Sequence, residues 1–177
     1  MDPDSALAFD EAALLKRCQD GQGHALAALV ERHQQRVFAL ASCLAGCDRD
    51  TAYQITVESF VEVLRVEAAV GDPPLFHRLL ARVIEHSRAA ASSPVFESPR
   101  VPGLSPQQQE LLRLVRQSLL AMPFESRVPL LLRDQLGLPY EEIAVLVGRT
   151  PQQAKTDTLA ARRQLREQLR ETLDRLR

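Results

Sequence analysis

A cluster of prolines in the middle of the sequence separates two stretches that have the pattern of α-helices. The cluster consists of Pro94, Pro99, Pro102 and Pro106. Proline lacks a backbone N–H and clashes with the preceding turn, so no regular helix is expected to run through this stretch. Residues 92–106 are therefore predicted to form an extended linker between two small domains, residues 1–91 and 107–177. Ser105 and Gln108 fit a capping box that starts the first helix of the second domain.

Both halves are predicted to be helical, because their apolar residues recur at intervals of three and four. In the first half these positions are Leu26, Leu29, Val30, Val37, Leu40, Ala41, Leu44, Ile55, Val57, Phe60, Val61, Leu64, Leu75, Leu79, Val83 and Ile84. The absence of Trp and the presence of only 2 Tyr disfavour a β-rich fold, because strands are enriched in aromatic residues. The expected fold class is all-α, with two small helical domains joined by the proline-rich linker.

The net charge of -1 is divided unevenly between the two halves. Residues 1–93 contain nine Lys and Arg against thirteen Asp and Glu, whereas residues 94–177 contain thirteen against ten. The positive second half is a modest indication of a polyanionic partner such as nucleic acid.

The three cysteines, Cys18, Cys43 and Cys47, indicate a reduced, cytoplasmic protein. Their number is odd, and the acidic N-terminal sequence lacks the apolar run of a secretory signal. No apolar stretch is long enough to span a membrane, so no membrane insertion is expected. Buried structural thiols are favoured over a metal or redox site, because further ligands at suitable spacings are missing. No phosphate loop, nucleophile elbow or HExxH motif occurs, so we expect no enzyme, no cofactor and no metal.

The sequence from Tyr140 to Leu165 predicts a helix-turn-helix, the arrangement that places a second helix against DNA. Gly148 can adopt a positive φ angle and end the first helix. Thr150 suits the N-cap of the next helix, Pro151 its first position, and Gln153 completes a capping box. Two helices joined by so short a turn must cross steeply.

The second helix of this motif is predicted to have a buried face and a face available to DNA. The buried positions are Ala154, Thr158, Ala161 and Leu165. The outward positions are Gln152, Gln153, Thr156, Asp157, Ala160 and Arg163, flanked by Lys155 and Arg162. Gln can pair with adenine, and Lys and Arg can bind guanine or phosphate, although any capped helical hairpin would show the same spacing. Asp157 either accepts a hydrogen bond from cytosine or indicates that DNA contact has been lost, because a carboxylate repels phosphate.

The residues around this motif resemble the C-terminal domain, region four, of extracytoplasmic-function sigma factors. The matching residues are Met122-Pro123, Arg127, Leu130-Leu131-Leu132-Arg133-Asp134, Gly137-Leu138, Tyr140-Glu141-Glu142-Ile143-Ala144, Gly148, Thr150, Lys155, Arg162 and Leu165. The first half is similar to region two of the same family in three segments: "LLKRCQDGQGHALAALVERHQQRVFALA", "DTAYQITVESFVEVLR" and "FHRLLARVIEHSRAA". The resemblance covers nearly the whole chain and suggests a divergent member of the bacterial sigma factors.

This resemblance implies a detachable initiation subunit whose partners are core RNA polymerase and promoter DNA, with an anti-sigma regulator as a further candidate. Region two of the family binds the polymerase clamp and opens the minus-ten element, and region four binds the minus-thirty-five element and the polymerase flap. The resemblance assigns clamp binding to Tyr53, Gln54, Val57 and Glu58. It assigns the minus-ten strand to His77, Arg78, Arg82, His86 and Arg88. It assigns promoter recognition to Thr150, Gln152, Gln153, Lys155 and Thr156, next to Asp157, Arg162 and Arg163.

The sequence departs from the family mainly at these functional positions. Gln54 and Val57 stand at the Asp and Gln positions of the usual Asp-x-x-Gln-Glu clamp motif. Phe76 is the only aromatic residue left in the helix that normally stacks on splayed bases, and Asp157 stands where the family often has Arg. Three alternatives therefore remain: an initiation factor, a sigma-like interaction protein with little or no promoter opening, and a plain helix-turn-helix regulator.

Overall fold

The computed structural model describes residues 11, 13–46, 49–65, 73–91 and 101–175, and every regular element in these ranges is an α-helix. The all-α fold class predicted from the sequence is confirmed. The helices are α2 (Gly23–Ala45), α3 (Arg49–Arg65), α4 (Leu75–Ala90), α5 (Pro106–Ala121), α6 (Phe124–Asp134), α7 (Tyr140–Val147) and α8 (Pro151–Arg175), preceded by helical residues 13–19. No helix in the described part of the chain is both long enough and apolar enough to cross a bilayer.

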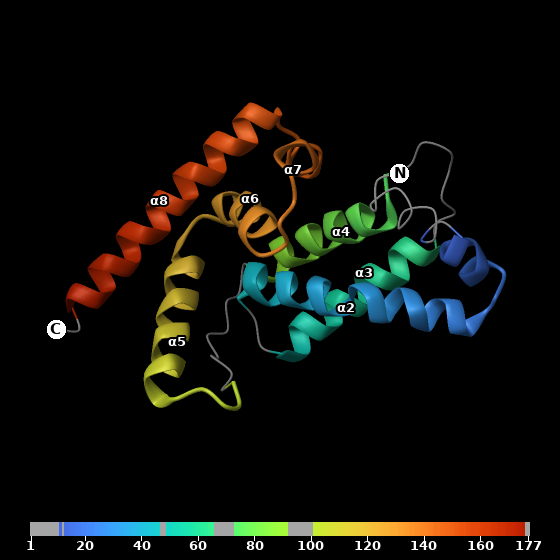
Figure 1. The fold of residues 1–177 in the computed structure, drawn as a ribbon, viewed down its shortest axis with the longest axis horizontal. Coiled ribbons are helices and arrows are strands. Elements are labelled where there is room, and N and C mark those ends of the chain that lie inside the picture. Colours follow the sequence, from blue (N-terminus) through green and yellow to red (C-terminus); the bar gives the residue numbers. More distant parts are fainter. Residues whose placement is uncertain (1–10, 12, 47–48, 66–72, 92–100, 176–177) are drawn as a thin grey trace.

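The N-terminal lobe, residues 11–91 as far as they are described, is a bundle in which α2, α3 and α4 pack against one another (Figure 1). Its centre contains Leu40 of α2, Ile55 of α3 and Leu79 of α4, each at most 4% exposed. These side chains lie at the helical spacing predicted from the sequence. Their burial stabilises the bundle by roughly 1.5 to 3 kcal/mol per large side chain.

On α3, some of the apolar positions at helical spacing are exposed, and small polar residues share the buried face. Val57 and Val61 are 40% and 39% exposed, and Leu26 of α2 is 43% exposed beside them. The buried face of α3 includes Thr56 and Ser59 instead. Their hydroxyls donate to the carbonyls of Ala52 and Ile55 in the preceding turn, at 2.8 and 2.7 Å. These hydrogen bonds satisfy the two small polar side chains inside the core, so apolar periodicity alone does not identify every buried position.

The C-terminal lobe, residues 101–175, consists of α5 to α8. Ser105 caps α5 by accepting from the Gln108 N–H, while the Gln108 side chain accepts from the Ser105 N–H, so the predicted capping box is confirmed. Pro129 lies inside α6 rather than in its first turn, and the helix continues to Asp134. The long helix α8 packs against α5, α6 and α7.

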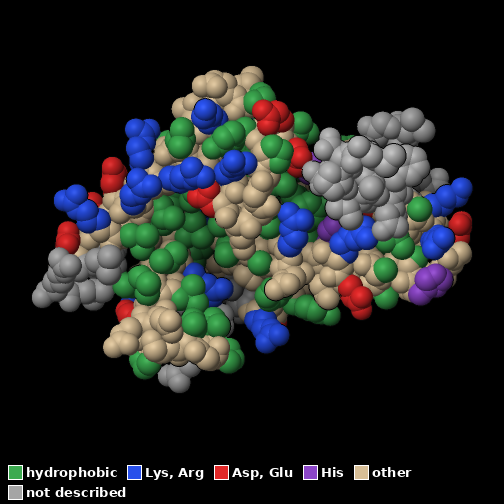
Figure 2. All heavy atoms as spheres, in the orientation of Figure 1, with side chains coloured by type: hydrophobic (Ala, Val, Ile, Leu, Met, Phe, Trp, Pro, Cys, Tyr) green, Lys and Arg blue, Asp and Glu red, His purple; other side chains and the backbone are tan. Residues whose placement is uncertain are grey.

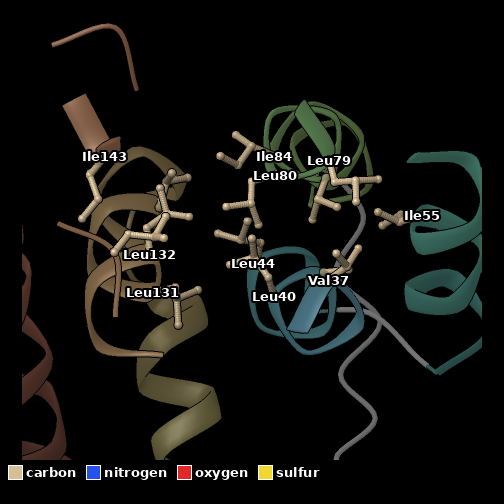
Figure 3. Packing of buried hydrophobic residues seen from close by; sticks show 14 of the residues in the cluster. Val37, Leu40, Leu44, Ile55, Leu79, Leu80, Ile84, Leu131, Leu132 and Ile143 are labelled. Atoms are coloured by element: carbon tan, nitrogen blue, oxygen red, sulfur yellow. The ribbon is translucent and has the colours of Figure 1, made fainter. Parts of the chain in front are cut away.

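The two lobes lie against each other and share one hydrophobic core. Helix α2 packs on α5 and α6, and α4 packs on α7. Figure 3 shows Leu44 and Leu80 of the N-terminal lobe directed toward Leu131 and Leu132 of α6. Residues 92–100 of the predicted linker lie outside the described residues.

Candidate nucleic-acid interface

The turn between α7 and α8 has the geometry that the sequence predicted. Gly148 follows the last residue of α7 with φ 65, and its N–H bonds back to the carbonyls of Ala144 and Val145. The Gln153 N–H donates to the Thr150 Oγ1 at 3.2 Å, and the Thr150 N–H donates to Gln153 Oε1 at 3.0 Å. The helix-turn-helix and its capping box are therefore confirmed.

The rotation of α8 about its axis is fixed by small buried side chains. Ala154 and Thr158 are 0% exposed and Ala161 is 2% exposed. The Thr158 hydroxyl donates to the Ala154 carbonyl at 2.7 Å, so it is satisfied without solvent. Small side chains on this face allow the close approach of α8 to α6 and α7, with which it packs. The opposite face of α8 consequently faces solvent. Its residues Gln152, Gln153, Lys155, Thr156, Asp157, Ala160 and Arg163 are all exposed.

The cations of α8 differ in their pairing. Figure 2 shows Lys and Arg side chains gathered along this helix. Lys155 and Arg163 make no ion pair with any of the described residues. Arg162, by contrast, donates from Nε to both carboxylate oxygens of Asp134 in α6, at 3.1 and 3.0 Å, and these hydrogen bonds raise the pKa of its guanidinium. Arg162 thus fastens α8 to α6, whereas Lys155 and Arg163 are available to a phosphate backbone.

Asp157 lies at the rim of a cavity of about 270 Å³ between α8, the start of α6 and the residues around the turn. Glu125, Arg149 and Gln164 line the same cavity. The acid therefore faces a second carboxylate and one arginine rather than bulk solvent alone. The sequence did not indicate that Glu125 would lie here, because the approach of α6 to α8 is a tertiary contact.

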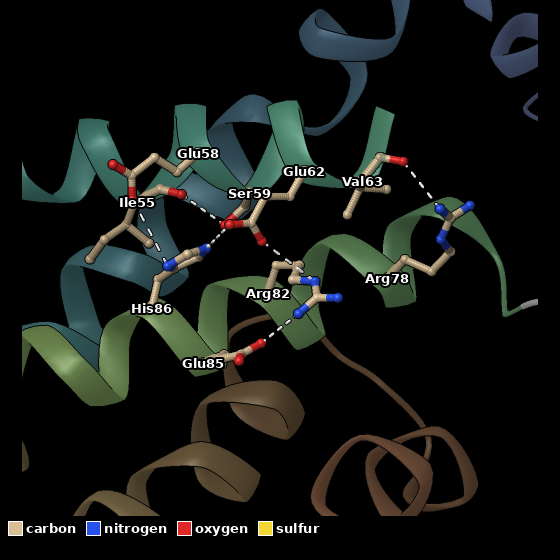
Figure 4. A network of polar contacts seen from close by, with 9 residues as sticks. All are labelled: Ile55, Glu58, Ser59, Glu62, Val63, Arg78, Arg82, Glu85 and His86. Carbon is tan, nitrogen blue, oxygen red and sulfur yellow. Dashed lines mark hydrogen bonds and ion pairs between the residues drawn. The ribbon is translucent and has the colours of Figure 1, made fainter. Parts of the chain in front are cut away.

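The cations of α4 are engaged by acids of α3 and by the backbone (Figure 4). Arg78 donates to the Val63 carbonyl at 3.1 Å. Arg82 lies 3.6 Å from the Glu62 carboxylate and donates to Glu85 at 2.7 Å. His86 lies 3.2 Å from Glu62, with Glu58 at 3.9 Å. Helix α4 therefore presents its basic side chains already paired.

Phe76, the one aromatic side chain of α4, is enclosed by other residues. Its ring stacks on the His33 ring of α2 with a centroid separation of 5.0 Å. The Arg36 guanidinium, also from α2, lies 4.1 Å from the centroid of the Phe76 ring. His33 in turn contacts the Glu11 carboxylate at 2.5 Å. Phe76 therefore contributes to packing against α2, and its ring is already engaged by two side chains of that helix.

Helix α3 lines an open apolar groove with α2. Tyr53 is 64% exposed, and the Gln54 side chain donates to Glu58 at 2.8 Å. The groove has a volume of about 480 Å³. Its apolar lining comes mainly from Leu26, Val30, Val57, Phe60, Val61 and Leu64. The sequence indicated this surface through Tyr53 and Val57, to which the family resemblance assigns clamp binding.

The described residues contain no group of three or more His, Cys, Asp or Glu side chains that could hold a metal ion. Cys18 and Cys43 are free and half-buried, and Cys47 lies outside the described residues. Burial raises the pKa of the Cys43 thiol, while nearby Arg116 acts in the opposite direction. A thiol with a raised pKa is a weak nucleophile at neutral pH.

The C-terminal lobe matches a known family. Residues 112–165 match the family model for sigma-70, region 4, which covers most of α5, all of α6 and α7, and α8 as far as Leu165. None of the curated proteins matches the chain. The match includes the capped turn and the exposed face of α8 described above, and region 4 implies promoter DNA and core RNA polymerase as partners. Residues 112–165 are thus similar to region 4 of the sigma-70 factors, a DNA-binding helix-turn-helix domain of transcription.

Proposed function

We propose that this chain is an initiation subunit of bacterial RNA polymerase of the extracytoplasmic-function type. The observation that best supports this proposal is the exposed polar face of α8, which starts directly after the capped turn of a region 4 domain. In this role the C-terminal lobe binds the minus-thirty-five element and the N-terminal lobe binds the polymerase. Such a subunit works in the cytoplasm, and an anti-sigma regulator is a further candidate partner. The subunit acts through binding free energy and performs no covalent chemistry.

The promoter-binding residues of this proposal divide into two groups by chemistry. Gln152, Gln153 and Thr156 have neutral polar ends that can bond to base edges in the major groove. Lys155 and Arg163 carry charges that bind phosphates and fix the register of the helix on the duplex. Thr150 positions all of them, because its side chain caps the helix from which they project.

The exposed groove on α3 is the proposed polymerase-binding surface. Tyr53 and Val57 supply apolar area, and Gln54 and Glu58 supply a polar rim beside it. An exposed apolar patch rimmed by polar residues is typical of a surface that binds a protein partner. We expect Val57→Asp to weaken capture of the chain by core polymerase. Val145→Asp is the matched control, since Val145 is 75% exposed on α7 of the other lobe.

A second candidate function, a sigma-like interaction protein that does not open promoters, is favoured by the state of α4. Its single aromatic ring, Phe76, stacks on His33 and lies against the guanidinium of Arg36, both of α2. Arg82 and His86 face the glutamates of α3. Strand capture by this type of helix normally needs free aromatic faces and free cations.

Reconstitution with core RNA polymerase separates these functions. The purified chain is first tested for capture by core polymerase and then for run-off transcription on genomic fragments. Capture with specific transcripts supports the initiation factor. Capture without transcripts supports the interaction protein. Tight sequence-specific binding to duplex DNA without any capture would overturn both and favour a simple regulator.

Asp157→Arg tests whether α8 contacts DNA in this role. If Asp157 accepts a hydrogen bond from a cytosine, the variant binds the true site more weakly, by roughly 1 to 3 kcal/mol. If the acid only repels phosphate, the variant binds every sequence more tightly and with a steeper salt dependence. Identical affinity and identical salt dependence would show that this part of α8 does not meet DNA.

A further inference from the structure

We propose that Leu159 of α8 is a specificity residue that contacts the C5-methyl group of a thymine in the major groove of DNA. This inference rests on the proposed function, since it requires α8 to lie against promoter DNA. In that complex Leu159 adds an apolar contact to the polar contacts of Gln152 and Thr156.

Leu159 is exposed, although the helix that carries it packs against three others. Figure 1 shows α5, α6 and α7 along one side of α8, and α8 contacts each of them. The buried residues Ala154, Thr158 and Ala161 form the face of α8 in these contacts. Successive residues of an α-helix are turned by about 100°, which places Leu159 on the opposite face. There its side chain is 43% exposed.

Leu159 shares a stripe along α8 with Gln152, Thr156 and Arg163. These residues follow one another at intervals of four, three and four positions, which is the spacing of a single helix face. All four are exposed. Leu159 lies two turns after Gln152, a distance of about 10 Å along the axis or roughly three base pairs of duplex. A helix that enters a major groove with its first turns can therefore bring both side chains to base edges of the same groove.

The N-terminal cap of α8 distinguishes its two glutamines. Oε1 of Gln153 accepts from both the N–H and the hydroxyl of Thr150, at 3.0 and 3.1 Å. The cap thus holds the Gln153 amide, which lies about 120° around the helix from Leu159. The Gln152 side chain makes no hydrogen bond with the described residues, so both ends of its amide are available for pairing with adenine. The face that reads bases is therefore the one that Gln152 shares with Leu159.

The surface around Leu159 is polar and positively charged. Lys155 and Arg163 stand four positions before and after it, and neither makes an ion pair with the described residues. Thr156 and Arg162 stand three positions away. A surface for a protein partner usually joins several apolar side chains into one patch. A single leucine between two cations instead fits an anionic ligand that carries an isolated apolar group.

Duplex DNA is a ligand of this kind. Its major groove displays one apolar group, the C5-methyl of thymine, among the donors and acceptors of the base edges, and phosphates line both sides of the groove. Apolar side chains contact this methyl group, whereas glutamine pairs with adenine. We therefore expect the site bound by α8 to contain an adenine at Gln152 and a thymine at Leu159, roughly three base pairs apart.

Replacement of thymine by uracil in a promoter duplex tests this contact, because the change removes only the methyl group. The duplex is the one that the complex of wild-type chain and core polymerase selects from a pool randomised at the minus-thirty-five element. Each thymine of the element, on either strand, is replaced in turn, and fluorescence anisotropy measures the affinity of the complex. At one position we expect a loss of about fourfold, the effect of one buried methyl group. This position should lie roughly three base pairs from the one whose preference is relaxed by Gln152→Ala.

Variants of Leu159 connect this loss to the side chain. Leu159→Ala should bind the thymine and uracil duplexes equally well at that position, and it should fold with wild-type helicity because the side chain is exposed. Leu159→Met keeps an apolar end and should keep most of the sensitivity to uracil. Leu111→Ala is the matched control, since Leu111 is 53% exposed on α5 of the same lobe, and it should show the full difference.

Three outcomes would overturn the inference and leave the proposed function standing. Wild type could bind every uracil duplex as tightly as the thymine duplex, or the difference could persist in Leu159→Ala. Loss of capture by core polymerase in Leu159→Ala would instead assign the residue to a protein-binding surface. If the wild-type complex selects no sequence from the pool, the proposed function is rejected, and the contact between Leu159 and thymine with it.

Discussion

Helices α4 and α8 are both basic, yet they present their charges in opposite ways. On α4, Arg82 and His86 face the Glu62 carboxylate of α3. On α8, Lys155 and Arg163 extend to solvent and make no ion pair among the described residues. The number of cations on a helix therefore does not locate a nucleic-acid surface. What matters is whether a neighbouring helix supplies acids to the same face.

The difference follows from the neighbours of each helix. Helix α3 carries Glu58 and Glu62 one turn apart, and it packs along α4 so that both acids reach His86. Helix α8 has neighbours only on its inner side, where Ala154 and Thr158 are buried. Arg162, at the edge of that face, meets an acid of another helix, Asp134 of α6. Helix α3 thus neutralises Arg82 and His86 of α4, whereas Lys155 and Arg163 of α8 have no acid partner among the described residues.

The largest expected effect comes from the core that the two lobes share. Leu132 is 0% exposed and faces the N-terminal lobe, so Leu132→Ala should lower the free energy of unfolding by roughly 2 to 5 kcal/mol. If the lobes unfold together, calorimetry should show one transition that shifts as a whole. Leu79→Ala in the centre of the N-terminal lobe is the matched control and should shift the same transition. Two transitions, of which each variant moves only one, would show that the lobes are independent.

The second prediction contrasts the two basic helices directly. Gln152→Ala on α8 should cost roughly 1 to 3 kcal/mol in binding of the polymerase complex to its promoter, because a base contact is lost. Arg82→Ala on α4 should leave binding of the free chain to duplex DNA nearly unchanged, since Glu62 and Glu85 already engage this arginine. Fluorescence anisotropy with labelled duplex measures both. The comparison would be reversed if Arg82→Ala lowered the DNA affinity of the free chain more than Gln152→Ala lowers that of the polymerase complex.

The sequence predicted local structure well and tertiary pairing poorly. The turn at Gly148 and the caps at Ser105 and Thr150 depend on residues three or four positions apart, so their chemistry is visible in the sequence. The hydrogen bond from Arg127 to the Leu44 carbonyl joins residues 83 positions apart, and no short-range pattern indicates it.

The exposed groove of the N-terminal lobe was missed for a related reason. Leu26 and Val61 have the same helical spacing as the buried residues, because a surface that is apolar for a partner has the same periodicity as one that is buried. The signal that could have separated the two was Thr56 and Ser59, whose hydroxyls can bond to their own helix and so occupy the buried face. The predicted binding residues Tyr53 and Val57 lie on the exposed side.

The third prediction uses two capping boxes of the same sequence type in different roles. Ser105-Pro106-Gln107-Gln108 starts α5, and Thr150-Pro151-Gln152-Gln153 starts α8. Ser105→Ala and Thr150→Ala should each lower stability by about 1 kcal/mol, the usual cost of a lost N-cap. Only Thr150→Ala should also weaken promoter binding, because it frays the turn that carries Gln152. Equal promoter affinity of the two variants in anisotropy measurements would indicate that α8 does not bind DNA through its first turn.

The smallest expected effect concerns the ion pair that joins α8 to α6. Asp134→Asn removes the charge that engages Arg162, and because both side chains are partly exposed the loss of stability should stay within about 1 kcal/mol. The released guanidinium then lies beside Lys155 and Arg163 on a helix edge that can reach phosphate. We expect somewhat tighter non-specific binding to duplex DNA, and a plot of log affinity against log salt that is steeper by about one phosphate contact. Glu141→Gln, which removes one negative charge from the first turn of α7, controls for net charge and should leave the slope unchanged. Equal slopes for the two variants would mean that Arg162 stays against the body of the lobe even without its acid.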